Sequence, residues 1–308
     1  MCGVVGLLIR DPELEPMLGS MLVPMIEALD ERGPDSSGIA VYDDSQRAGN
    51  ADNAHDEADP PVRISLGSDV EVDWMALGCE LLDATGAPAH LEPFGAGLVI
   101  EVPADGVEAL VAGLGSRPEV KVLGSGLHLR ILKDTGRPTD TCARYGIAAW
   151  RGYMAVAHTR MATESAVTVL HSHPFVPAHD LCVVHNGSFS NYASVRRRLR
   201  AGGVSFDSDN DSEVGARFLA SRLEAGDDLE EATRWVMKEM DGFFTLVIAS
   251  DQAMSVVRDA FACKPAVVAE MPGYVAVASE YRALAELPDI GHAMVFEPQP
   301  EEVYTWKR

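Results

Sequence analysis

The chain has 308 residues, of which 47% are apolar and 23% charged, a composition typical of globular proteins. Its formal net charge of −22 at pH 7 argues against binding along a nucleic-acid backbone. No apolar run approaches the ~20 residues of a membrane span, and no leader with a charged start and an apolar core precedes the first predicted strand. These features predict a cytoplasmic protein that binds neither membrane nor nucleic acid.

The 5 cysteines are scattered along the chain, and none has the spacing of a zinc, iron–sulfur or redox site. An odd, scattered set without a leader indicates reduced thiols. Histidines cluster only at His171 and His173, without an acidic partner at helical spacing, so a metal site is the less favoured interpretation there. We therefore expect neither a metal nor a cofactor.

Cysteine occupies the second position, directly before a buried strand predicted over residues 3–9. An initiator methionine followed by a small residue is normally removed, which would leave Cys2 with both a thiol and a free α-amine. Both groups exchange protons near neutral pH, so one residue can supply a nucleophile and its general base. The plainer alternative is a small residue before an ordinary strand.

Periodic apolar residues next predict a helix over residues 17–29, which ends at an Arg-Gly-Pro sequence. A polar turn is expected at residues 35–38 and a strand at residues 39–42. The chain is predicted to be one domain over residues 1–308, with an insertion at about 43–130. This insertion begins as an exposed loop and continues as a small α+β region without a chemical motif, so a structural or partner-facing role is favoured.

Polar motifs then follow two strand-like segments. A strand over residues 154–157 leads into residues 158–165, and an apolar strand over residues 181–184 leads into residues 185–190. An acidic segment at residues 207–213 opens a helix. The remaining segments predict a helix over residues 229–240 and an antiparallel meander over residues 243–250, 255–259, 266–269 and 274–278.

Four groups that are distant in sequence make chemical sense together. Cys2 supplies a nucleophile, and Asn186 with Gly187 offers a side-chain amide and a backbone N–H, which suit the oxyanion formed when a thiolate attacks an amide. Arg160 offers a guanidinium fork that matches a carboxylate, and Asp211 offers an anion for an ammonium. Together they describe attack on the side chain of a free amino acid, with glutamine as the amide-bearing candidate.

The motifs that carry these residues occur in the order found in class II glutamine amidotransferases, which are N-terminal-nucleophile hydrolases. These motifs are residues 2–6, 32–38, 158–163, 185–187 and 211–213. Segments 241–248, 257–259 and 278–280 also look like the second sheet of that family. The chain resembles the family over nearly its whole length apart from the insertion.

This resemblance implies an α+β fold, a four-layer αββα sandwich of the Ntn-hydrolase type, with the N-terminal cysteine at one sheet edge. It implies that Cys2 attacks the δ-carbonyl of glutamine, that its α-amine shuttles the proton, and that Asn186 and Gly187 stabilise the oxyanion. A γ-glutamyl thioester would form, ammonia would leave, and water would release glutamate.

The resemblance also assigns the α-carboxylate of glutamine to Arg160 and its α-ammonium to Asp211. Arg32 matches the family arginine near the nucleophile, and Thr163 is assigned to the substrate site with it. The plainer alternatives are an arginine paired with a structural acid at Arg160 and a helix cap at Asp211.

Two positions depart from the family pattern, because Met161 and Glu164 stand where relatives that make aminosugars usually carry Trp and His. The chain is also too short to include a sugar isomerase, a synthetase or a phosphoribosyl-transfer domain. It looks more like the amidotransferase domain of glutamate synthase, and resembles the stand-alone glutaminase-like subunit of N-methylglutamate synthase. His158 and His185 are expected to be structural, since the mechanism needs no histidine.

These observations predict a glutaminase subunit that passes ammonia to a partner resembling the flavin and iron–sulfur portion of glutamate synthase. A second hypothesis is an N-terminal-nucleophile hydrolase of another amide, such as an acylase, although paired carboxylate and ammonium binders argue against it. A third is a non-catalytic glutamine-binding or regulatory subunit of such a complex, which retention of Met1 would favour. The ammonia acceptor and the partner chains stay open.

Overall fold

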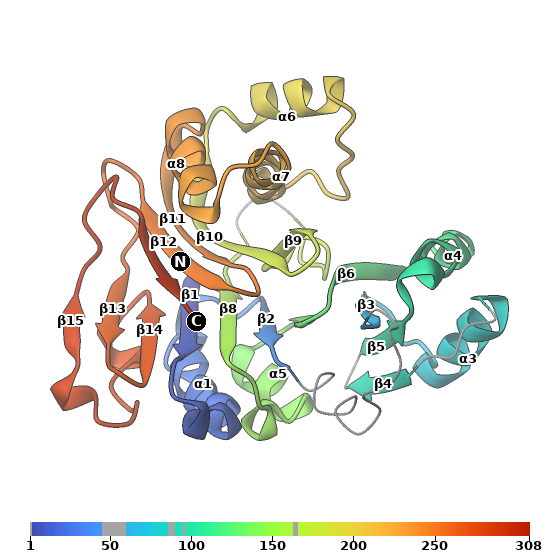
Figure 1. Ribbon diagram of the computed structural model, residues 1–308, viewed down its shortest axis with the longest axis horizontal. Coiled ribbons are helices and arrows are strands. Elements are labelled where there is room, and N and C mark those ends of the chain that lie inside the picture. The colour runs from blue at the N-terminus through green and yellow to red at the C-terminus, as the bar shows by residue number, and fades with distance from the viewer. Residues whose placement is uncertain (1, 45–59, 86–89, 95–96, 163–165) are drawn as a thin grey trace.

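Two β-sheets packed face to face form the centre of the protein (Figure 1). The computed structural model describes residues 2–44, 60–85, 90–94, 97–162 and 166–308. The seven-stranded sheet has the order β15-β13-β14-β1-β8-β2-β7, with β1 (Gly3–Ile9), β2 (Ser36–Tyr42), β7 (Leu129–Thr135), β8 (Met154–Arg160), β13 (Val267–Glu270), β14 (Tyr274–Ala278) and β15 (Met294–Phe296). The five-stranded sheet has the order β16-β12-β11-β10-β9, with β9 (Phe175–Ala178), β10 (Leu181–Phe189), β11 (Gly242–Ala249), β12 (Ala253–Arg258) and β16 (Tyr304–Lys307).

Helices cover the outer face of each sheet, which gives four layers in the order αββα (Figure 1). The seven-stranded sheet carries α1 (Leu18–Glu27) and α5 (Pro138–Arg144), and the five-stranded sheet carries α6 (Tyr192–Ala201), α7 (Asp211–Glu224) and α8 (Leu229–Glu239). Short 3₁₀ helices lie at Pro12–Met17, Asp30–Arg32, Ala104–Gly106, Leu114–Ser116, Ile147–Ala149, Tyr281–Ala283 and Ile290–His292. None of the helices in the described part of the chain is long and apolar enough to cross a bilayer. The predicted four-layer fold is confirmed.

The first strand is buried on both faces, which explains its uninterrupted apolar sequence. Val5, Leu7 and Ile9 face the core beneath α1, whereas Val4 and Leu8 face the core between the two sheets. β1 is an inner strand, paired with β8 on one side and β14 on the other. Cys2 therefore lies at the end of a central strand. The sequence analysis expected this residue at one edge of a sheet. It lies at the edge formed by the strand ends, and not on an unpaired outer strand.

The strand register brings distant motifs to one end of this sandwich. Gly3 pairs with Thr159, so Cys2 and Arg160 occupy the next positions on neighbouring strands. In the other sheet, Asn186 of β10 pairs with Thr245 of β11.

A smaller unit lies beside the two main sheets (Figure 1). It consists of the four-stranded sheet β4-β5-β3-β6 with two helices, and its elements are β3 (Val62–Ser68), α3 (Trp74–Thr85), β4 (His90–Phe94), β5 (Gly97–Val102), α4 (Val107–Gly113) and β6 (Val120–Gly126). Buried side chains such as Ile64, Leu98 and Leu110 give it a core of its own. β7 belongs to the main sheet, although the sequence placed its first residues in the insertion. We infer that the inserted unit spans about residues 62–126.

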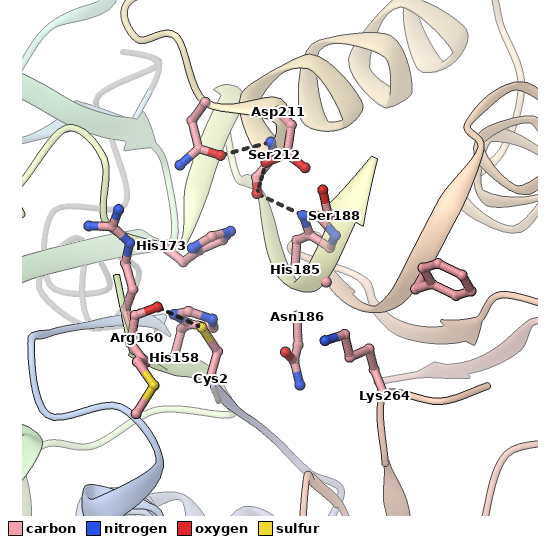
Figure 2. A pocket seen from close by; sticks show the side chains of 14 residues that line it. Cys2, His158, Arg160, His173, His185, Asn186, Ser188, Asp211, Ser212 and Lys264 are labelled. Carbon is pink, nitrogen blue, oxygen red and sulfur yellow. Dashed lines mark hydrogen bonds between the residues drawn. The ribbon is translucent and has the colours of Figure 1, made fainter. Parts of the chain in front are cut away.

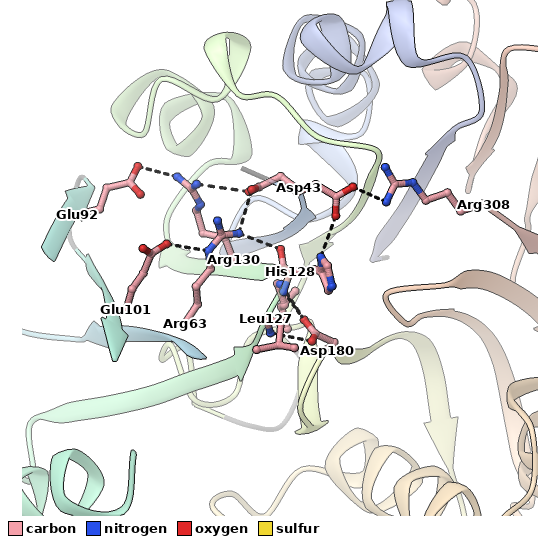
Figure 3. Close-up of polar contacts among 11 residues, drawn as sticks. Asp43, Arg63, Glu92, Glu101, Leu127, His128, Arg130, Asp180 and Arg308 are labelled. Atoms are coloured by element: carbon pink, nitrogen blue, oxygen red, sulfur yellow. Dashed lines mark hydrogen bonds and ion pairs between the residues drawn. The ribbon is translucent and has the colours of Figure 1, made fainter. Parts of the chain in front are cut away.

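Polar contacts fix this unit to the main sheets (Figure 3). Arg63 of β3 is only 1% exposed and pairs with Asp43, just after β2, and with Glu101 of β5, both at 3.0 Å. Asp180, between β9 and β10, accepts hydrogen bonds from three successive backbone N–H groups of residues 127–129 at 2.8 to 2.9 Å. The ion pair between Arg63 and Asp43, and the hydrogen bonds of Asp180 just after β6, thus join the unit to the main sheets.

Two predictions about secondary structure were wrong. The polar residues Ser36 and Ser37, expected in a turn, belong to β2, and their hydroxyl groups lie 2.9 Å from those of Ser172 and Thr141. Those bonds satisfy polar groups inside the sandwich, which a local reading of the sequence does not reveal. The late strands also form no single meander, because β11 and β12 join the five-stranded sheet while β13 and β14 join the seven-stranded sheet.

Candidate active site

A pocket of about 400 Å³ opens where the start of β1 meets the ends of β8 and β10 (Figure 2). This volume suits a small-molecule ligand. Its lining includes Cys2, Arg160, Asn186, Gly187 and Asp211, which the sequence had assigned to one site. Thr163, also assigned to substrate binding, lies outside the described residues.

The backbone of Cys2 is fixed from behind by Arg32. The Nε atom of Arg32 donates a hydrogen bond to the carbonyl oxygen of Cys2 at 3.2 Å, and its guanidinium forms an ion pair with Glu280. Burial opposes ionisation of Glu280, but the hydrogen bond and charge of Arg32 outweigh it and lower the pKa of this carboxyl group. Arg32 is thus placed to orient Cys2, and the pocket lining does not include it. Its assignment to substrate binding stays a prediction.

The thiol of Cys2 points toward the loop after β8, with Sγ 3.8 Å from the carbonyl oxygen of Met161 (Figure 2). Arg160, the last residue of β8, is 4% exposed and lines the same side of the pocket. Its Nη1 atom donates to the carbonyl of Ala166 at 2.9 Å, and its backbone carbonyl accepts from the N–H of Asp35 at 3.1 Å. Burial lowers the pKa of Arg160, yet a guanidinium keeps its charge in proteins. It offers a desolvated cation to an anionic ligand.

Asn186 and Gly187 lie within β10, not after it as the sequence suggested. The side chain of Asn186 is buried, and its Nδ2 atom has no hydrogen-bond partner among the described residues. Such a buried donor is costly unless a ligand or water satisfies it. Because Asn186 shares a sheet face with Val184, which packs in the core between the sheets, its amide faces the side from which Cys2 approaches.

The N–H of Gly187 faces an open strand edge. Successive N–H groups of an antiparallel strand point to opposite edges, and that of Phe189, two residues on, donates to Asp211 and not to β11. β9 covers this edge only at Leu181 and Val183, so the N–H of Gly187 points into the pocket region. Gly187 also has a φ of +151°, and a Cβ atom there would lie 1.9 Å from the carbonyl oxygen of Phe243, so only glycine fits.

Asp211 opens α7 on the opposite side of β10 from Asn186 (Figure 2). Its Oδ2 atom accepts the N–H of Phe189 at 2.7 Å, and its Oδ1 atom accepts the hydroxyl of Ser212 at 3.3 Å. The helix cap is Asn210, whose side chain accepts the N–H of Ser212 at 2.9 Å. The alternative in which Asp211 serves only as the N-cap is therefore wrong.

Three buried histidines, His158, His173 and His185, line the pocket between these groups. The ring centres of His158 and His173 are 4.2 Å apart, and those of His173 and His185 are 6.2 Å apart. For His173 the sequence suggested only a metal site, as the less favoured interpretation, because its position in a loop gives no periodic signal.

A hydroxyl group links His185 to Asp211. The Nδ1 atom of His185 lies 2.7 Å from the hydroxyl oxygen of Ser212, and that oxygen lies 3.3 Å from Oδ1 of Asp211. Burial lowers the pKa of His158 to about 3 and that of His185 to about 4, so both rings are neutral at pH 7.

These buried imidazoles predict a specific pH dependence of stability. Unfolded histidines take up a proton below pH ~6.5, whereas folded His185 does so only below about 4, so stability falls as pH drops through this interval. Each buried histidine contributes a slope of up to ~1.4 kcal/mol per pH unit to the free energy of unfolding. Urea unfolding between pH 7 and 4 measures the slope.

The matched variants are His185→Asn and His292→Asn, because His292 is exposed. The first should flatten the slope and the second should not. An equal slope in both variants would contradict a neutral buried His185.

Comparison with known proteins identifies the family. A glutamine amidotransferase domain model matches residues 158–286. The glutamine amidotransferase-like protein GlxB of Rhizobium meliloti (strain 1021) is 42% identical over 99% of this chain and 98% of its own length. The chain belongs to the class II glutamine amidotransferase family. A putative glutamine amidotransferase of Methanothermobacter thermautotrophicus is 30% identical over 99% of both chains.

Longer proteins are similar to the chain over part of their own length. Glutamine–fructose-6-phosphate aminotransferase of Zymomonas mobilis is 37% identical over 136 residues, which are 44% of this chain and 22% of that protein. The fold is similar to that of glutamine phosphoribosylpyrophosphate amidotransferase from B. subtilis, with a TM-score of 0.60 and 16% identity over 99% of this chain and 49% of that one. The predicted family, enzyme class and Ntn-hydrolase fold are confirmed. Membership of this family favours glutamine amide transfer over hydrolysis of another amide.

Proposed function

We propose that this amidotransferase is a glutaminase subunit that hydrolyses L-glutamine through a Cys2 γ-glutamyl thioester and passes the ammonia to a partner. The convergence of Cys2, Asn186 and Gly187 on one pocket carries the proposal. A nucleophile, a side-chain amide and a backbone N–H from two different sheets meet there, at the end of β1 and within β10.

The reaction begins when removal of Met1 frees the α-amine of Cys2. This amine takes the proton of the thiol as Sγ adds to the δ-carbonyl carbon of glutamine. The resulting oxyanion accepts hydrogen bonds from Asn186 Nδ2 and from the N–H of Gly187, both of which are preorganised by β10. Collapse of the intermediate breaks the C–N bond, and the α-ammonium returns the proton to the leaving ammonia. Water then attacks the thioester, releases glutamate and restores the thiol.

The two ends of the pocket match the two charges on the α-carbon of glutamine. Arg160 would bind the α-carboxylate through its planar fork, and Asp211 would bind the α-ammonium. Asp211 keeps lone pairs for this contact, because a carboxylate has about four acceptor sites and two contacts with Phe189 and Ser212 are formed.

Conservative variants of these two residues test substrate recognition. Arg160→Lys keeps the charge but loses the bidentate fork, and Asp211→Asn keeps the shape but loses the charge. We expect each to lower kcat/KM for glutamine ~10- to 100-fold, since a hydrogen bond to a charged group contributes ~1.5–3 kcal/mol. Steady-state glutamate release measures this effect, with Arg137→Lys as control because Arg137 pairs with Asp30 on another part of the surface. Wild-type kinetics in both variants would show that neither residue touches the substrate.

The ammonia acceptor is proposed to lie on another polypeptide. Every residue with an assigned role belongs to glutamine hydrolysis, and ammonia released into water is protonated and lost. A partner resembling the flavin and iron–sulfur portion of glutamate synthase, or the corresponding part of N-methylglutamate synthase, would accept it. The inserted unit is a candidate docking surface, and its attachment to the main sheets through Arg63 and Asp180 suits such a role.

The test has two parts. Intact-mass measurement of the purified chain should show loss of Met1, and the chain should release glutamate and ammonia from glutamine. Addition of purified synthase-like subunits should stimulate the reaction and suppress release of free ammonia. Full activity alone without stimulation would favour a free-standing glutaminase, and retained Met1 without activity would favour a binding subunit.

A further inference from the structure

Lys264 is a charged residue in the pocket to which the proposed reaction gives no role. It lies in the loop between β12 and β13, and its ammonium points toward Asn186 from the side away from Arg160 (Figure 2). Within the ranges that the structure describes, its side chain forms no ion pair or hydrogen bond with another residue. A half-buried cation is therefore directed at the ligand space.

The loop that carries Lys264 is held in one conformation. The carboxylate of Asp259 accepts hydrogen bonds from the N–H groups of Phe244 and Phe261 at 2.9 and 2.8 Å. Arg258, which is 6% exposed, donates to the carbonyl of Pro298 at 3.1 Å. Because these contacts are buried or partly buried, they fix the path of the chain toward the pocket.

The backbone of Lys264 is attached to the strand position opposite Asn186. The hydroxyl of Thr245 donates to the carbonyl oxygen of Lys264 at 2.7 Å, and Thr245 pairs with Asn186 in the β10–β11 ladder. Directly paired residues project their side chains from the same sheet face. Lys264 thus meets β11 on the face that looks toward Cys2, whereas Asp211 lies on the opposite side of β10.

This placement sets Lys264 at the amide end of the proposed glutamine site. Arg160 and Asp211 carry opposite charges and match the zwitterionic α-carbon of glutamine. The carboxamide that faces Cys2 is neutral in the substrate, but it becomes an oxyanion in each tetrahedral intermediate and a γ-carboxylate in the product. The positive charge of Lys264 therefore meets a negative charge only after the reaction begins. An interaction that is stronger in the transition state than with the substrate accelerates the reaction.

We propose that Lys264 is a further catalytic residue, whose ammonium stabilises the negative charge that develops on the δ-carbonyl oxygen and then on the γ-carboxylate of glutamate. The inference rests on the proposed glutaminase function and deepens it. In this role Lys264 interacts through its charge and transfers no proton. Asn186 and Gly187 remain the oxyanion donors, and Lys264 adds charge beside them.

The test compares Lys264→Met, Lys264→Arg and Lys307→Met in glutamine hydrolysis. Methionine keeps the length and apolar stem of lysine without its charge, arginine restores a cation, and Lys307 is an exposed residue at the end of β16. We expect Lys264→Met to lower kcat ~10- to 100-fold with KM for glutamine changed less than ~3-fold, and Lys264→Arg to recover most of the loss. The inhibition constant of glutamate should rise ~10-fold in Lys264→Met, since the product carries the charge that the substrate lacks.

Three outcomes separate the claims. Unchanged kcat and unchanged glutamate inhibition in Lys264→Met, with an active wild-type chain, would overturn the role of Lys264 and leave the glutaminase proposal standing. An equal loss in the methionine and arginine variants, with a lowered Tm, would assign Lys264 to structure and overturn catalysis by its charge. A wild-type chain that neither hydrolyses glutamine nor reacts at Cys2 with a diazo-ketone analogue of glutamine would overturn the proposed function itself.

Discussion

Replacement of Cys2 by alanine is expected to abolish glutamine hydrolysis while the protein stays folded. The proposed mechanism has no other nucleophile, and the α-amine of alanine alone cannot form the thioester. The side chain lies at the end of β1 and contributes little to either core, so the Tm should change little. Glutamate release by the two chains under saturating glutamine measures the effect.

A diazo-ketone analogue of glutamine provides the control, because it should add one label per chain, at Cys2. Cys142 and Cys182 are buried, and burial raises the pKa of both thiols to about 12, so neither competes. Cys79 and Cys263 are exposed, and a Cys79→Ala/Cys263→Ala double variant should label and react like the wild type. Labelling that persists in Cys2→Ala would contradict the assignment of the nucleophile.

The second large effect is expected for Asn186→Ala, with a loss of ~100- to 1000-fold in kcat and little change in KM. This is the magnitude observed when one oxyanion donor is removed, because the donor acts on charge that exists only in the transition state. The Nδ2 atom of Asn186 forms no hydrogen bond with the described part of the protein, so the substitution removes no hydrogen bond of that atom.

The stability and labelling of this variant separate chemistry from structure. The Tm should stay near that of the wild type, and Cys2 should still react with the diazo-ketone analogue, since the thiol is unchanged. Asn186→Asp is a sharper variant of equal size, and it should lose more activity because a carboxylate repels the oxyanion. A variant Asn186→Ala with wild-type kcat would remove Asn186 from the oxyanion site.

The sequence predicted several residues of the pocket but not the other residues that line it. Cys2, Arg160 and Asn186 could be singled out because each lies in a short motif next to or within an apolar strand. The positions of Lys264 and His173 in the pocket could not be predicted from the residues next to them in the sequence. Lys264 is held by a hydrogen bond from Thr245 on β11. His173 packs against the rings of His158 on β8 and His185 on β10.

In the fold, likewise, strands could be predicted from their own sequences, whereas their pairing with distant strands could not. β1 and β14 were predictable because both of their faces are buried and their sequences are almost entirely apolar. The sheet to which each late strand belongs was not predictable, since β12 and β13 have similar apolar sequences but join different sheets. The start of β2 was missed because the partners of Ser36 and Ser37 lie more than 100 residues away.

The position of β1 also determines when the enzyme can work during its own synthesis. The N–H of Val4 bonds to Ser279, 275 residues further along the chain, and β14 must be present before β1 is paired on both sides. At ~5–20 residues per second, a ribosome needs ~15–60 s to supply that partner. Until then, β1 lacks one of its two pairing partners. A chain whose translation is interrupted before β14 therefore has no complete seven-stranded sheet beside the pocket that contains Cys2.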